Sequence, residues 1–135
     1  MILAETIHIG IVGSRRRDTA RDLQEVRHAL ISELSNYTDR EIIIVSGGCP
    51  KGGDRFAEML AEELDLRTII HYPDRSSLPN PPHRWDFARI NYERNTLIAR
   101  DSDILIACVA SDRKGGTEDT IKKYLKMGKK NLILV

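Results

Sequence analysis

The sequence predicts an α/β fold of three layers, in which a doubly wound, mostly parallel sheet of five strands lies between helices in a Rossmann-like arrangement. Short runs of Ile, Leu and Val recur along the chain, as in strands that are buried on both faces of a sheet. Segments with apolar residues three and four positions apart separate these runs, as in amphipathic helices. The chain has 135 residues, enough for one hydrophobic core, so we expect residues 1–135 to form a single domain.

The first strand is predicted at residues 6–12, where an Ile/Val run stops at Gly13 as a buried strand does before a turn. Asp18 or Thr19 can cap the helix that follows, and this helix is expected to reach about Tyr37. The apolar positions of this helix are Leu23, Val26, Leu30 and Leu34.

The second strand is predicted at residues 41–45, and a glycine-rich loop joins it to a second amphipathic helix. The apolar stripe of that helix is Ala57, Leu60, Ala61 and Leu64. A third strand is predicted at residues 67–72. The stretch from Pro73 to Pro82 is rich in proline, and we expect it to be a surface loop and not a linker between domains.

The second half of the chain predicts a helix from about residue 83 to 100 and a continuous apolar strand at residues 103–109. Thr117 is expected to cap a last helix, and Gly128 lies where a left-handed glycine ends a helix. Residues 131–135 form the predicted fifth strand. Strands and helices that alternate in this way imply right-handed crossovers and a parallel sheet.

A glycine-rich loop, residues 46–54 with the sequence SGGCPKGGD, follows the second strand. Such a loop before a helix N-terminus suits a bound anion, although the glycines could also serve only the turn and Asp54 only the helix cap. The carboxyl ends of parallel strands share one edge of a sheet, so the turns at residues 13–17, 46–54 and 110–117 should open together. We therefore expect a phosphate-binding or nucleotide-binding pocket there.

The composition of the chain and the motifs that it lacks argue against several classes of function. The net charge of +1 provides no general field for a polyanion, so we do not expect nucleic acid as a partner, and Arg16 and Arg17 are expected to be solvated. No segment resembles a signal peptide or a membrane span, which predicts a cytoplasmic protein without membrane contact. The two cysteines and four histidines lack the spacing of metal ligands, and Walker and dinucleotide motifs are absent. We expect no metal and no cofactor.

Four motifs follow one another along the chain: VGSRR after the first strand, SGGCPKGGDRFAE after the second, ERN in the third helix and KGGT before the last helix. This ordered set resembles the SLOG superfamily, which groups DNA-processing protein A with the Lonely Guy type phosphoribohydrolases, and in particular its short stand-alone bacterial members. The resemblance covers nearly the whole chain. It implies a modified Rossmann fold that binds or senses a nucleotide or a nucleotide-derived phosphorylated ligand.

The resemblance also implies which residues bind that ligand. Gly115 and Gly116 would present backbone N–H groups, and Thr117 a hydroxyl, to a phosphate at a helix N-terminus. Arg15 and Arg94 would pair with the phosphate. The other residues expected in the site are Gly13, Ser14, Gly47, Gly48, Lys51, Gly52, Asp54 and Asn95.

Two alternative functions stay open. The phosphoribohydrolases split the N-glycosidic bond of a nucleoside monophosphate with an arginine in the third helix and a glutamate three residues after a GT pair. Arg94 matches that arginine, but Thr120 occupies the place of the glutamate, and Glu118 points about 200° away from Thr120 on a helix. An enzyme of this kind would use Arg94 and Glu118 as catalytic residues. The other alternative is a DNA-binding module like DNA-processing protein A.

Self-association is a further expectation. The predicted helices carry more apolar residues than one core needs, for instance Ile31, Trp85, Phe87 and Ile90. Homodimers are the commonest oligomers, so we expect a homodimer. The alternative is that these residues belong to the core or cover the proline-rich loop.

Overall fold

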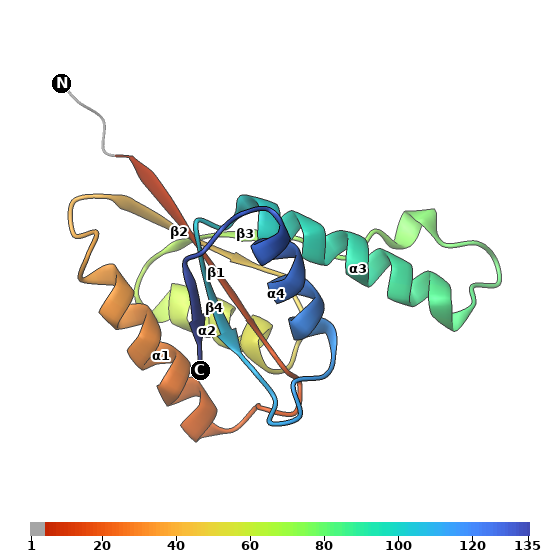
Figure 1. Ribbon diagram of the computed structural model, residues 1–135, viewed down its shortest axis with the longest axis horizontal. Coiled ribbons are helices and arrows are strands. Elements are labelled where there is room, and N and C mark those ends of the chain that lie inside the picture. The colour runs from red at the N-terminus through yellow and green to blue at the C-terminus, as the bar shows by residue number, and fades with distance from the viewer. Residues whose placement is uncertain (1–4) are drawn as a thin grey trace.

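The computed structural model describes residues 5–135 and contains a five-stranded, entirely parallel sheet in the order β3-β2-β1-β4-β5 (Figure 1). The chain runs outward from β1 to β3 on one side and then from β4 to β5 on the other, so the sheet is doubly wound as predicted. The strands are β1 (Thr6–Gly13), β2 (Glu41–Ser46), β3 (Arg67–Ile70), β4 (Ile104–Cys108) and β5 (Leu132–Leu134).

Four α-helices cover the two faces of this sheet. They are α1 (Ala20–Leu34), α2 (Gly53–Glu63), α3 (Arg84–Asp101) and α4 (Gly116–Lys126). Helices α1 and α2 pack on one face, and α3 and α4 pack together on the other. Figure 1 shows the N-terminal half of α3 and the loop before it projecting beyond the sheet. Among the helices of residues 5–135, none is both long and apolar enough to cross a membrane.

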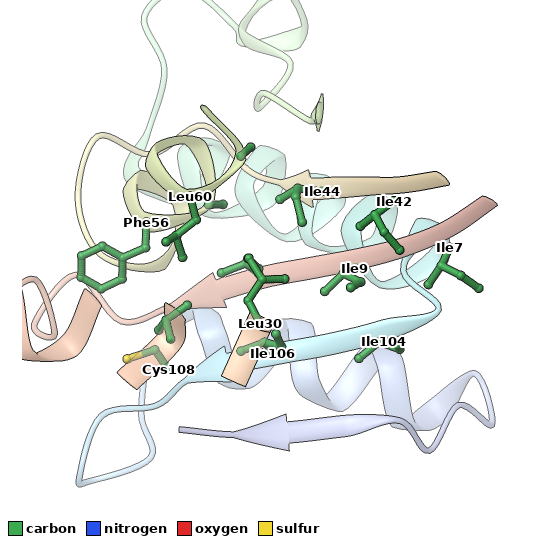
Figure 2. Packing of buried hydrophobic residues seen from close by; sticks show 14 residues of the cluster. Ile7, Ile9, Leu30, Ile42, Ile44, Phe56, Leu60, Ile104, Ile106 and Cys108 are labelled. Carbon is green, nitrogen blue, oxygen red and sulfur yellow. The ribbon is translucent and has the colours of Figure 1, made fainter. Parts of the chain in front are cut away.

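Alternating side chains of the central strands divide the core into two layers. Ile104 and Ile106 of β4 face α1 and α2, in the cluster that Figure 2 shows, whereas Leu105 faces α3 and α4. Every residue of β4 is buried, which explains why its sequence is a continuous apolar run. The turns at the carboxyl ends of the strands therefore extend from strands that are fixed in a well-packed core.

Helix α1 begins with a capping box. The Thr19 hydroxyl accepts a hydrogen bond from the Asp22 N–H, and the Asp22 carboxylate accepts one from the Thr19 N–H. The helix ends at Leu34, one turn before the predicted end at Tyr37. Asp18 does not cap α1; its carboxylate accepts instead from the Gly52 N–H at 2.8 Å, which joins the turn after β1 to the turn after β2.

Other boundaries also differ from the prediction, β4 and β5 by one residue at each end. Helix α4 has Gly115 as its N-cap and begins at Gly116, so Thr117 lies inside the first turn and is not the cap. Gly128, with a φ of +83°, follows the end of α4 as expected. Strand β3 ends at Ile70, short of residue 72, and the proline-rich stretch contains a 3-10 turn, η1 (Arg75–Ser77).

Arg17 and Ile90 are more buried than the sequence suggests. The prediction that Arg17 is solvated is wrong, because its guanidinium donates to the backbone oxygens of Val109 and Val135 and forms ion pairs with two acidic residues of α1. Ile90 is also buried, so it is unavailable to a partner surface. The other residues expected there are exposed: Ile31, Trp85 and Phe87.

Candidate functional site

A cleft of about 420 Å³ opens at the carboxyl ends of β1, β2 and β4. The turns after these strands, one face of α3 and the first turn of α4 form its walls. The volume lies within the range of small-molecule sites. Of the residues expected in the site, the cleft is lined by Gly13, Ser14, Arg15, Asp54, Arg94, Asn95, Gly115, Gly116 and Thr117.

The turns after β1 and β2 are held together at Gly53. A Cβ at Gly53 would lie 2.2 Å from the backbone nitrogen of Gly13 and 2.2 Å from the carbonyl carbon of Val12, so only glycine fits. Gly52, with a φ of +70°, packs in the same way against the carbonyl of Ser14. The start of α2 therefore lies directly on the end of β1, and this contact places both turns at one rim.

Most residues of the glycine-rich loop do not line the cleft but pack against residues around it. Gly47 lies against the Arg94 and Asp54 side chains, Gly48 against the Tyr72 ring, and Lys51 is exposed to solvent. Only Cys49 and Asp54 of this loop border the cleft. The residues placed outside it, contrary to expectation, are Gly47, Gly48, Lys51 and Gly52.

Asp54 is a buried carboxylate at the wall of the cleft. It lies in the first turn of α2, whose N-cap is Gly52, and its Oδ2 accepts a hydrogen bond from the Cys49 N–H at 3.0 Å. Asp54 thus orders the loop before the helix and does not act as the N-cap. Burial raises the pKa of this carboxyl, although the Cys49 N–H and the guanidinium of Arg94 favour its charged form.

Arg94 is half-buried beside Asp54, and protein acceptors occupy much of its guanidinium. It donates to the Gly47 carbonyl, to the Asn95 side-chain oxygen at 3.0 Å, and more weakly to Asn91 at 3.4 Å. Burial lowers the pKa of Arg94, although the negative charge of Asp54 acts in the opposite direction. Three of its five N–H groups donate to the protein, so Arg94 positions the loop, and the other two have no acceptor among residues 5–135.

The start of α4 forms the opposite wall. Asn95 donates its side-chain amide to the Gly116 carbonyl at 3.3 Å and to the Asp119 carboxylate at 3.1 Å, which attaches α4 to α3. Gly115 has a φ of +122°, and no side chain of residues 5–135 caps the helix. The first backbone N–H groups of α4 therefore lack a capping acceptor, and the helix dipole makes this end attractive to an anion.

Two of the cations that border the cleft have neither an ion-pair partner nor a side-chain hydrogen bond in the described part of the chain. Within residues 5–135, neither Arg15 nor Lys114 forms an ion pair or donates a side-chain hydrogen bond. Arg16 differs, because its guanidinium makes a bidentate pair with Asp112 at 2.8 and 2.7 Å. The free positive charge at the cleft therefore comes from Arg15 and Lys114, next to the uncapped start of α4.

Glu118 and Thr120 lie on different sides of α4, as the helical spacing predicts. Glu118 forms an ion pair with Arg113 at 2.8 Å and does not border the cleft. Thr120 is buried and borders the cleft, and its hydroxyl lies 3.4 Å from the Gly116 carbonyl. A catalytic role for Glu118 would require it to leave Arg113 and reach the other side of the helix.

Several residues of the cleft were not among the expected ones. Ala88, Asn91 and Tyr92 precede Asn95 on α3 at spacings of three and four, so they share its face and could have been found by helical periodicity. Cys49 lies inside the glycine-rich loop. Lys114 directly precedes Gly115 and Gly116. A lysine next to a glycine pair before a predicted helix is the sequence signal that could have identified Lys114 as a residue of the cleft.

Comparison with known proteins supports the fold. No model of a protein family matches this chain, and no curated protein matches it. A solved structure does: the X-ray structure of TM1055, a structural genomics target, has a TM-score of 0.56 and 17% identity, over 94% of this chain and 71% of that chain. This likeness shows a shared Rossmann-like α/β fold.

Proposed function

We propose that the cleft binds a nucleotide or a nucleotide-derived phosphorylated molecule, with the phosphate at the start of α4. The observation that carries the proposal is the meeting of two unpaired cations, Arg15 and Lys114, with the uncapped N-terminus of a helix in one cleft. Backbone N–H groups and a helix dipole stabilise a phosphate, and a guanidinium can hold it through two hydrogen bonds.

The sugar would lie next to the phosphate, toward Asp54 and Arg94. The Asp54 carboxylate borders the cleft and can accept hydrogen bonds from ribose hydroxyls. The resemblance of the four motifs to the SLOG superfamily supports the same function, because these motifs supply the first turn, the glycine-rich loop, the polar face of α3 and the start of α4.

Isothermal titration calorimetry with a panel of phosphorylated ligands tests the proposal. The panel contains nucleoside mono-, di- and triphosphates, ADP-ribose, ribose 5-phosphate, inorganic phosphate and adenosine. At least one phosphorylated member should bind more tightly than about 1 mM, whereas adenosine should bind far more weakly. The proposal fails if no phosphorylated member binds in that range.

Variants locate the binding. Arg15→Ala should weaken the affinity about 10- to 150-fold, because a hydrogen bond to a charged group contributes about 1.5–3 kcal/mol. Arg21→Ala is the matched control, since its side chain is 90% exposed on α1 and does not border the cleft. Equal affinity of Arg15→Ala and the unmodified protein would contradict the phosphate position.

A second candidate function is hydrolysis of the N-glycosidic bond of a bound nucleoside monophosphate. The observation that favours it is the buried carboxyl of Asp54 beside Arg94, since a raised carboxyl pKa suits a general acid or base. Release of adenine from AMP, followed by chromatography, tests this activity. Asp54→Asn should abolish it, and Glu58→Gln, an exposed carboxylate one turn later on α2, should not. Loss in Glu118→Gln instead would assign the role to Glu118.

A further inference from the structure

The cleft widens toward solvent along one face of α3. Of the residues on that face, Ile98 is 1% exposed, Asn95 5% and Tyr92 51%, and all three border the cleft. The deep end therefore lies near Asn95, which holds the start of α4, and the open end lies near Tyr92. One helical turn of about 5 Å separates these two positions along α3.

Tyr92 is exposed but held in place. The Lys123 ammonium lies over its ring, 5.4 Å from the centroid, and donates to its backbone carbonyl. The Thr96 hydroxyl donates to the same carbonyl at 3.2 Å. Lys123 is itself paired with Asp119 at 2.8 Å, so the cation that covers one face of the ring belongs to α4. Tyr92 is 51% exposed and borders the cleft, so the face of the ring away from Lys123 is available to a ligand.

We propose that Tyr92 is the stacking platform for the base of the ligand, at the open end of the cleft. This inference rests on the proposed function, because it takes the phosphate to lie at the start of α4. The ribose would lie between the phosphate and Tyr92, with its hydroxyls directed toward Asp54 and Arg94 as proposed above. Ala88 lies one turn further out on the same face and adds a small apolar surface beside the platform. Every base has an aromatic face that can stack, so Tyr92 would favour ligands that carry a base without distinguishing one base from another.

The test compares ligands with and without a base. Calorimetry is performed with the four common ribonucleoside 5′-monophosphates and with ribose 5-phosphate. At least one monophosphate should bind about 5- to 150-fold more tightly than ribose 5-phosphate, the range expected for one stacked base. In Tyr92→Ala this advantage should disappear while the affinity for ribose 5-phosphate stays unchanged, and Tyr92→Phe should retain the advantage.

Phe87→Ala is the control for loss of an exposed aromatic residue from α3. Phe87 does not border the cleft and lies about 140° from Tyr92 around the helix axis. If the monophosphates bind no more tightly than ribose 5-phosphate, or if Tyr92→Ala retains their advantage, the inference fails while the proposed function stands. If ribose 5-phosphate and all monophosphates fail to bind, the inference fails, and the proposed function fails with it only when the di- and triphosphates, ADP-ribose and inorganic phosphate also do not bind.

Discussion

Substitution of Gly53 by alanine tests the contact that brings the turns after β1 and β2 to one rim. The added Cβ would meet backbone atoms of Val12 and Gly13 at 2.2 Å, where ordinary van der Waals contact begins at 3.4 Å. These atoms belong to the central strand and cannot rotate away. Helix α2 would have to withdraw by about 1 Å, which loosens its packing on the sheet.

The expected cost is about 3 kcal/mol in the free energy of unfolding, at the upper end of the usual range for overpacking. For a domain of this size, that cost lowers the melting temperature by about 10 °C. Urea and thermal unfolding, followed by circular dichroism, measure both quantities. Gly116→Ala is the matched control, because Gly116 is also the first residue of a helix but its Cβ would meet only one atom, at 4.0 Å. A change below about 0.5 kcal/mol in Gly53→Ala would show that the contact of Gly53 with β1 does not restrict this position to glycine.

Two further predictions concern titratable groups. Cys49 should react with iodoacetamide in the folded protein, and saturating AMP should slow that reaction. Cys108 should react only after unfolding, because it is buried and burial raises its pKa to about 11. Equal labelling rates would contradict this difference. Burial raises the pKa of Asp54 in the folded protein above its value in the unfolded chain. Between these two pKa values the folded state binds more protons than the unfolded state, so the free energy of unfolding falls as the pH rises. The stability of Asp54→Asn relative to the unmodified protein should therefore increase from about pH 4 to about pH 7, and a constant difference would count against this account.

The fold could be predicted because each element carries a local signal. The apolar runs of β1, β2 and β4 mark strands that are buried on both faces, and the three- and four-residue spacing marks the helices. Helix ends were less predictable, since they depend on which polar group closes the turn. Thr19 caps α1 through a reciprocal pair with Asp22, whereas Thr117 has no such partner at the start of α4.

The candidate site was predictable where topology alone determines position. Parallel strands bring their following turns to one edge, which places Gly13 and Gly116 at one cleft. Contacts between distant side chains were not predictable. Arg17 finds acceptors 92 and 118 residues away, and the sequence around it contains no sign of either. Periodicity puts Tyr92 on the face of Asn95, but only the packing of α3 on the sheet turns that face toward the cleft.

A titration of the ¹⁵N-labelled protein with AMP, followed by amide chemical shifts, tests whether a phosphate binds to the backbone N–H groups at the start of α4, in the cleft that Arg15 also borders. The Gly116 and Thr117 amide signals should shift in proportion to occupancy, and adenosine at equal concentration should leave them in place. Shifts confined to the groove between α1 and β5, around His28 and Ile133, with these two amides unmoved, would contradict the account.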